Sequence, residues 1–218
     1  DQAIAHVKDG MTVMVGGFMG CGSPHKVIDA LVAKGVKDLT IICNDAGVPG
    51  RGVGKLLTNG QIKTLIASHV GLNPEVAQRM NTDVEEDKLE CILVPQGTLA
   101  ERIRAGGTGL GVFLTPTGVG TIVAEGKQVL NVGGRDYLLE LPLRADFAFI
   151  RGSVTDKFGN TTYNGTTRTF NPMMAAAADH VIVGACKIVE IGDIDPNNVV
   201  TSGIYVDSIV GGEKQWQI

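Results

Sequence analysis

The sequence predicts an α/β fold in which a mainly parallel sheet is covered by helices on both faces. Three observations support this prediction. Short apolar runs that favour β-structure alternate with segments of helical periodicity, as expected for successive βαβ units. Glycine accounts for 30 of the 218 residues, about twice its usual share, and it gathers between these runs rather than in linkers. In the second half, Gly133-Gly134 separates two apolar runs, which indicates an antiparallel hairpin excursion.

The first part of the chain is read as strand, glycine loop, helix and strand. Residues 12–15 (TVMV) form a continuous β-favouring run, which predicts a buried strand. Ser23 as N-cap and Pro24 at the first helical position predict the start of a helix, and Gly35 predicts its end. The run LTIIC at 39–43 predicts the next strand, which completes a βαβ unit.

The other elements follow from the same patterns. The apolar spacing of the first eight residues predicts a short helix that ends at Asp9-Gly10. No internal repeat or linker interrupts the later pattern, so we expect residues 1–218 to form one domain. The later predicted strands are 63–68, 89–95, two strands within 127–141, 146–152 and 180–185, and the later predicted helices are 73–80, 98–106 and 173–178.

The composition excludes several classes of function. The net charge is −4 and no run of Lys and Arg stands out, which argues against nucleic acid and acidic membranes as partners. No apolar run reaches the roughly 18 residues of a membrane-spanning helix, and no secretory leader is expected at the start. The cysteines and the four histidines are scattered, so we expect no metal site and free thiols in a reducing cytosol; the cysteines are Cys21, Cys43, Cys91 and Cys186.

A glycine loop follows the first predicted strand. At this position, backbone N–H groups and the helix dipole favour an anion, and glycines allow a backbone to approach a ligand closely. The loop is neither a dinucleotide-binding Gly-x-Gly-x-x-Gly nor an ATP-type phosphate loop. A binding loop and a tight βα turn both remain open interpretations. Its residues are Gly16, Gly17, Phe18, Met19, Gly20, Cys21 and Gly22.

Two more segments lie where loops are expected. Gln96 ends a predicted strand, and ligands of open α/β sheets bind beyond the carboxyl ends of the strands. Its amide suits a carboxylate or carbonyl substrate, although a strand-end Gln can equally cap the backbone. The glycine-rich stretch 105–121 predicts a long surface loop, and Phe113 and Leu114 within it favour an ordered, packed conformation.

None of the acidic residues has the setting of an activated nucleophile, which is strained and framed by glycines. Glu101 and Arg104 have the spacing of an ion pair on a helix surface. The acidic run 85–87 and the pair Asp193 and Asp195 are best explained as solvated faces. The residues by themselves therefore indicate an α/β protein that binds a small anionic molecule at glycine-rich βα loops, and they leave its chemistry open.

Four segments, in this order, resemble the family I coenzyme A transferases. The run DGMTVMVGGFMGCGSP matches the N-terminal signature of that family. The resemblance implies the alpha (A) subunit of the 3-oxoacid type, which exchanges CoA between acetate or butyrate and acetoacetate. The four segments are 9–24, 94–121, 138–160 and 167–178.

The resemblance also implies how the reaction is divided between two chains. In this family a glutamate of the beta subunit attacks the acyl-CoA thioester and forms a glutamyl-CoA intermediate. The Ser-Glu-Asn-Gly motif of beta subunits is absent here, so no catalytic residue is expected on this chain. The expected partner is a homologous beta subunit, in an α₂β₂ assembly in the cytoplasm. CoA and acyl-CoA act as substrates, and no permanently bound cofactor is expected.

By the same resemblance, residues 16–22 match the segment assigned to CoA binding, and Gln96 matches the glutamine that holds the substrate carboxylate. Cys21 stands where relatives vary, so no separate role is expected for its thiol. The competing hypothesis is a sugar-phosphate-binding isomerase or sensor module of similar fold, because fold analogy by itself does not settle function. The PQGTLAERIRAGG block at 95–107 favours the transferase.

Overall fold

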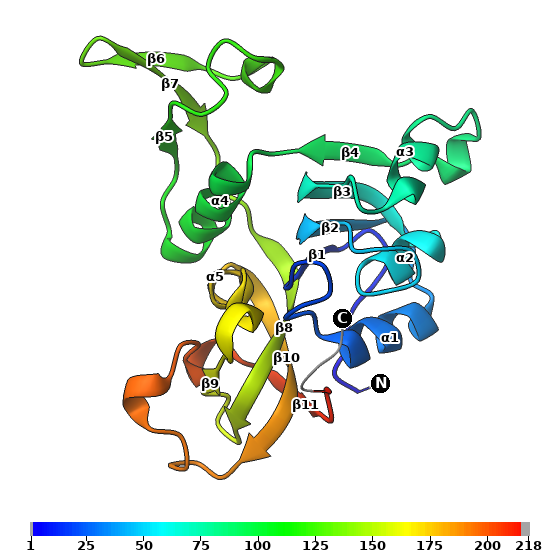
Figure 1. Cartoon of the computed structure of the whole chain (residues 1–218), viewed down its shortest axis with the longest axis vertical. Coiled ribbons are helices and arrows are strands. Elements are labelled where there is room, and N and C mark those ends of the chain that lie inside the picture. Colours follow the sequence, from blue (N-terminus) through cyan, green and yellow to red (C-terminus); the bar gives the residue numbers. More distant parts are fainter. Residues whose placement is uncertain (1, 215–218) are drawn as a thin grey trace.

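The computed structural model describes residues 2–214 and has an eight-stranded main sheet at its centre (Figure 1). Seven strands lie in the order β11-β10-β8-β1-β2-β3-β4, and all neighbours in this path are parallel. The eighth strand, β9, pairs antiparallel with β8. The mainly parallel sheet predicted from the sequence is confirmed. Its strands are β1 (Thr12–Val15), β2 (Leu39–Asp45), β3 (Ile62–His69), β4 (Glu90–Leu93), β8 (Ala145–Asp156), β9 (Thr161–Thr162), β10 (Ala178–Val189) and β11 (Ser208–Gly211).

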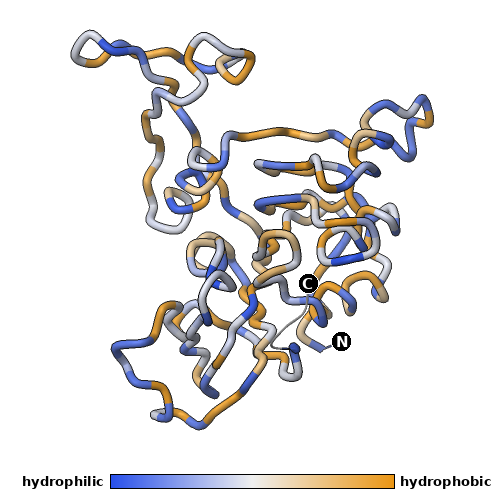
Figure 2. Tube along the Cα trace, viewed as in Figure 1, coloured by the Kyte–Doolittle hydropathy of each residue, from blue (hydrophilic) through white to orange (hydrophobic). Residues whose placement is uncertain are grey.

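Helices cover both faces of this sheet, because successive side chains of a strand point to opposite faces. In β1, Val13 and Val15 pack in a core with α1, α2 and α3, whereas Met14 packs in a second core with α4 and α5. In Figure 2 the central strands carry long hydrophobic stretches, and the segment 81–88 between α3 and β4 is largely hydrophilic. The helices are α1 (His25–Lys34), α2 (Gly54–Thr58), α3 (Pro74–Met80), α4 (Gln96–Thr108) and α5 (Asn171–Ala176).

A separate three-stranded antiparallel sheet forms the predicted hairpin excursion. It contains β5 (Phe113–Thr115), β6 (Val129–Val132) and β7 (Arg135–Glu140), in the order β5-β7-β6. Gly133 and Gly134 form the turn with φ of 61° and 82°, which glycine adopts without a steric penalty. In Figure 1 this small sheet projects beyond α4, away from the main sheet.

The glycine-rich stretch 105–121 is more regular than the predicted loop. Its first residues continue α4 as far as Thr108, and Gly109 ends this helix with a left-handed φ of 73°. Phe113 and Leu114 are ordered, as expected, because they form most of β5, but Leu114 is 39% exposed and is not packed as predicted. Several short 3-10 helices complete the described chain: Glu85–Asp87, Ile122–Ala124, Gly165–Arg168, Pro196–Asn198 and Gly203–Tyr205.

Two local predictions near the N-terminus are wrong. The opening residues form turns rather than a helix, with i→i+3 bonds such as that from the N–H of Val7 to the carbonyl of Ile4 (3.1 Å). The segment is too short to repay the cost of helix nucleation. Ser23 does not cap α1, which begins at His25 with Pro24 as N-cap. Gly35 ends α1 as predicted, with a left-handed φ of 74°.

Candidate functional site

The candidate site lies at the carboxyl ends of the strands β1, β2 and β3, together with the connection from β4 to α4. These strands are adjacent in the sheet, so the loops that follow them meet at one edge. The glycine loop, residues 16–22, follows β1, and Gln96 begins α4 immediately after the β4 connection. Parallel sheets bind ligands at this edge. The structure therefore places both sequence-predicted segments at the same end of the sheet.

The end of β2 joins these two segments. The Asn44 Oδ1 accepts a hydrogen bond from Nε2 of Gln96 (2.9 Å) and another from Oγ of Ser68 (2.7 Å). The next residue, Asp45, accepts the N–H of Met19 from the glycine loop at Oδ1 (3.1 Å). Successive residues of one strand thus contact Gln96 on one side and the loop on the other.

Sequence reasoning missed both Asn44 and Asp45. They follow the apolar run LTIIC directly, and a polar pair at the end of a buried parallel strand is the signal that could have identified them. Both side chains are buried, although charged and amide side chains usually remain exposed. Their burial follows from the hydrogen bonds that they form with neighbouring loops.

The Asp45 carboxyl supports two loops at once. Besides Met19, it accepts the N–H of Gly47 at Oδ2 (3.1 Å), so it also holds the connection from β2 to α2. Burial raises the pKa of Asp45 above its ordinary value, and the two donated N–H groups oppose that rise. Asp45 is an internal support of the loop.

The glycine loop has a backbone that other residues rarely adopt. Gly17, Gly20 and Gly22 have φ of 113°, 82° and 76°, and Met19 between them has φ of 52°. Two mutual backbone bonds of 2.9 Å between Phe18 and Cys21 close the turn. Since a positive φ costs energy in a residue with a side chain, the Asp45 contact with the Met19 amide compensates for local strain.

The structure gives a packing reason for three of the loop glycines. A Cβ at Gly16 would lie 1.7 Å from Oδ1 of Asn171, and a Cβ at Gly17 would lie 2.0 Å from Oγ of Ser23. A Cβ at Gly22 would lie 2.4 Å from the carbonyl oxygen of Thr167. The chain's own atoms occupy these spaces, so glycine is required there whether or not a ligand approaches. The tight-turn interpretation therefore explains these three positions.

The N-terminus of α1 is also occupied by the chain itself. Oε1 of Glu213 accepts the N–H of Lys26 (2.7 Å), and the Glu213 side chain is only 4% exposed. Burial raises the pKa of Glu213, whereas the Lys26 amide and the nearby Arg151 charge lower it. Glu213 therefore caps the first turn of α1 with a side chain of the chain itself.

The cavity directly beneath the glycine loop is too small for a substrate. Its volume is about 10 Å³, which is at most the space of one water molecule. The side of the loop that a ligand can reach is therefore its outer surface, where the Met19 side chain is 45% exposed. The cavity is lined by Val15, Gly16, Gly17, Gly20, Ser23, Cys43, Asp45, Gly47, Gly52 and Val53.

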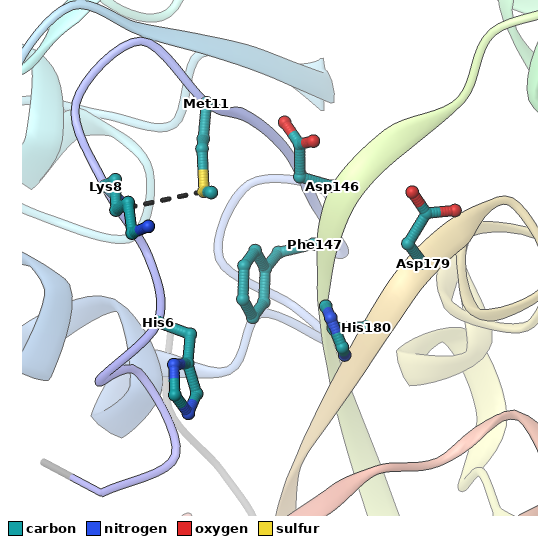
Figure 3. Close-up of a pocket in the computed structure, with 7 residues that line it drawn as sticks. All are labelled: His6, Lys8, Met11, Asp146, Phe147, Asp179 and His180. Carbon is teal, nitrogen blue, oxygen red and sulfur yellow. Dashed lines mark hydrogen bonds between the residues drawn. The ribbon is translucent and has the colours of Figure 1, made fainter.

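A larger pocket of about 290 Å³ lies at the opposite edge of the sheet (Figure 3). Its acidic groups are already paired, because Asp146 accepts the N–H of Thr12 (2.8 Å) and Asp179 accepts a bond from Arg144 (2.7 Å). It is lined by the starts of β8 and β10, away from the carboxyl ends where the glycine loop lies. It is not part of the candidate site. The lining residues are His6, Lys8, Met11, Asp146, Phe147, Asp179 and His180.

The acidic residues considered from the sequence have structural partners or face solvent. Glu101 pairs with Arg104 at 2.8 Å, as the spacing predicted. Glu140 is buried and pairs with Lys127 at 2.6 Å and Arg102 at 3.8 Å.

Within residues 2–214 no cluster of His, Cys, Asp and Glu could hold a metal ion. All four cysteines are free thiols. None of the described helices has the length and apolar character to cross a membrane.

Comparisons with known proteins identify the family. A family model described as coenzyme A transferase matches residues 1–212. The chain is 50% identical to the acetate CoA-transferase subunit alpha of Escherichia coli K12 over 98% of its length and 95% of the relative. It is 51% identical to the acetoacetyl-CoA:acetate/butyrate CoA transferase alpha subunit of Clostridium acetobutylicum, over 93% of this chain and 91% of that one.

Solved structures confirm the fold. An acyl-CoA transferase from E. coli O157:H7, in a thioester complex with CoA, matches with a TM-score of 0.82 at 23% identity. That match covers 96% of this chain and 46% of the longer one. Glutaconate coenzyme A-transferase from Acidaminococcus fermentans matches with a TM-score of 0.81 at 19% identity, over 95% of this chain and 73% of the other. The chain belongs to the coenzyme A transferase family, and it is of the alpha-subunit type.

Proposed function

We propose that this chain is the alpha subunit of a short-chain acyl-CoA:carboxylate CoA-transferase that exchanges CoA among acetate, butyrate and acetoacetate. The identity of about 50% to alpha subunits named for these acids carries the choice of substrate class. The sugar-phosphate alternative has no support, because every relative and family match described above is a CoA transferase.

In the proposed site, the outer face of residues 16–22 contacts acyl-CoA and Gln96 holds the carboxylate of the acceptor acid. Asn44 supports this role by accepting one of the two N–H groups of Gln96 Nε2 (2.9 Å), which leaves the second N–H to donate to the carboxylate. Asp45 keeps the glycine loop in its strained shape through the Met19 amide. This chain thus supplies the walls of the site, and residues 1–218 act as one domain.

The nucleophile comes from the beta subunit in this proposal. Its glutamate attacks the thioester carbonyl and CoA leaves as the thiolate, which gives a mixed anhydride of the glutamate and the acyl group. The thiolate then attacks the glutamyl carbonyl, which releases the acyl group as the free carboxylate and leaves CoA bound to the glutamate as a thioester. The acceptor acid then takes CoA in the reverse of these steps, which gives ping-pong transfer. We place the two chains in an α₂β₂ assembly in the cytoplasm, with no permanently bound cofactor.

The location of the covalent intermediate tests this proposal. The two-chain enzyme is mixed with acyl-CoA in the absence of acceptor and analysed by intact-mass spectrometry under conditions that preserve thioesters. We expect the mass of CoA to appear on the beta chain and not on this chain. A CoA adduct on a glutamate of this chain would overturn the proposed division of labour.

A further inference from the structure

The segment that leads into α5 supports the glycine loop from the side of β8. This segment, 167–171, belongs to a motif found in the sequence analysis, and the proposed function gives it no task. Its last residue, Asn171, is the first residue of α5 and is completely buried. A buried amide needs partners for its donors and its acceptor, so the contacts of Asn171 show what it holds in place.

The Asn171 side chain connects three parts of the molecule. Its Nδ2 donates to the carbonyl of Gly22 at the end of the glycine loop (3.0 Å) and to the carbonyl of Thr167 (2.9 Å). Its Oδ1 accepts the N–H of Arg151 in β8 (3.2 Å). One side chain therefore connects the loop to the central sheet, because it acts both as a hydrogen-bond donor and as an acceptor.

The start of the loop packs against the same amide. The position of a Cβ at Gly16 is 1.7 Å from Oδ1 of Asn171, so any side chain at residue 16 would displace this amide. The adjoining Thr169 has a positive φ of 36°, and its Oγ1 lies 3.3 Å from Nδ2 of Asn171. Strained residues persist only where their surroundings hold them, and here Asn171 is part of those surroundings.

We propose that Asn171 is a positioning residue for the transferase site, which holds both ends of the glycine loop in register with β8. Asp45 holds the middle of the loop from β2 through the Met19 amide, so the loop is fixed from two sides. This inference rests on the proposed function, in which the outer face of residues 16–22 contacts acyl-CoA. Asn171 itself is buried and acts through the loop.

The first test changes the polarity of the side chain and keeps its shape. In the enzyme assembled with its beta subunit, Asn171→Asp retains an acceptor for Arg151 and directs a carboxylate at the carbonyls of Gly22 and Thr167. We expect kcat/KM to fall roughly ten- to a hundredfold, the size expected when buried groups lose their partners. Asn81→Asp is the matched control, because exposed Asn81 also donates Nδ2 to a carbonyl, that of Ala77 (2.7 Å). This control should keep wild-type kinetics.

The second test separates positioning from general stability by a double-mutant cycle. Gly16→Ala alone should abolish most of the activity, because its methyl group meets the Asn171 amide. In an Asn171→Ala background that amide is absent. The factor by which Gly16→Ala lowers kcat/KM should therefore be at least ten times smaller there than in the wild-type background. Asn171→Ser replaces Asn171→Ala if the latter does not assemble. Circular dichroism and thermal unfolding are recorded for every variant.

Coupling between Gly16 and Asn171 in kcat/KM supports the positioning role. Two results would overturn it: a Gly16→Ala effect of equal size in both backgrounds, or wild-type kcat/KM in folded Asn171→Asp enzyme. The location of the CoA adduct is measured separately on the wild-type enzyme. An adduct on this chain would refute the proposed function. The role of Asn171 is decided separately, by the ratio of the Gly16→Ala effects on kcat/KM in the two backgrounds.

Discussion

Asn44 and Asp45 show how two neighbouring residues can serve two parts of one site. Because successive residues of a strand point in opposite directions, Asn44 reaches Gln96 and Ser68, while Asp45 reaches Met19 and Gly47. Their burial makes these bonds strong determinants of geometry, since a buried polar group without a partner destabilises the fold. At the scale of single residues, the site is therefore organised from the end of β2.

Replacement of Gln96 by alanine should impair catalysis and spare the fold. If Gln96 binds the acceptor carboxylate, Gln96→Ala should lower transition-state stabilisation by about 1.5–3 kcal/mol, the range for a hydrogen bond to a charged group. The thermal midpoint should hardly change, because the side chain is exposed. Steady-state kinetics with acetoacetate measure the effect, and Gln78→Ala on the exposed surface of α3 is the control. Normal kinetics, or unfolding of the variant, would show that Gln96 has only a structural role.

Gly17→Ala should destabilise the loop by more than the cost of a positive φ alone. The new methyl group would lie 2.0 Å from Oγ of Ser23, and φ at Gly17 is 113°. Gly10→Ala is the matched control, because Gly10 also has a positive φ (75°) but no atom within 4 Å of its Cβ position. We expect Gly10→Ala to cost about 1 kcal/mol and retain activity. Gly17→Ala should lose activity as well as stability. Equal effects of the two changes would contradict the role of the Ser23 contact.

At the scale of elements, the end of the described chain completes the start of α1. Glu213 lies after β11 and reaches the first turn of a helix 187 residues earlier in the sequence. Its second carboxylate oxygen, Oε2, is buried and has no partner. A cap of this kind satisfies a free N–H group and complements the helix dipole, but burial of the charge opposes that gain.

This balance predicts a pH dependence for the stability of the chain. Burial raises the pKa of Glu213 above the ordinary 4.5, so the folded state binds its proton more tightly than the unfolded state. Stability from this group is therefore greatest at low pH and declines as pH rises from about 4.5 through the folded-state pKa. We expect Glu213→Gln to be more stable than wild type at pH 8, and the difference to shrink toward pH 4.

Urea unfolding at a series of pH values measures this difference. The variant Glu86→Gln removes a carboxyl from the exposed 3-10 helix between α3 and β4, and it should follow the wild-type curve. A Glu213→Gln variant that is less stable than wild type at pH 8 would show that the capping bond outweighs the cost of burial.

At the scale of the whole molecule, the candidate site is an open edge of the sheet rather than an enclosed pocket. Large apolar side chains also remain exposed on the described surface, among them Ile122 at 81% and Ile204 at 74%. An open site is what the proposed role as one half of a two-chain enzyme requires.

The purified chain should therefore be folded and inactive by itself. Circular dichroism should show the α/β fold, and no CoA exchange between acetyl-CoA and acetoacetate should be detected. Addition of the beta subunit should restore exchange, because the proposed function assigns the glutamate to that chain. Robust exchange by this chain without a partner would contradict the prediction, and a beta subunit prepared alone serves as the second control.

Several parts of this protein were predictable because they depend on local interactions. The runs TVMV and LTIIC became β1 and β2, Asn73 caps α3, and Gly133-Gly134 turns the hairpin. Each of these features depends on residues close in sequence, where alternation, capping and φ preference act directly. Element ends were less predictable; Gln96, for example, was expected at a strand end and lies in the first turn of α4.

The sequence by itself determined the α/β class, the order of the main elements, the glycine loop and the resemblance to a family that the comparisons then confirmed. Only the tertiary structure decided which groups surround that loop. Gly22 and Asn171 are 149 residues apart and bonded, and Lys26 and Glu213 are 187 residues apart and bonded. The physical reason is that local patterns specify strands and helices, whereas buried polar groups find their partners only when distant segments pack together.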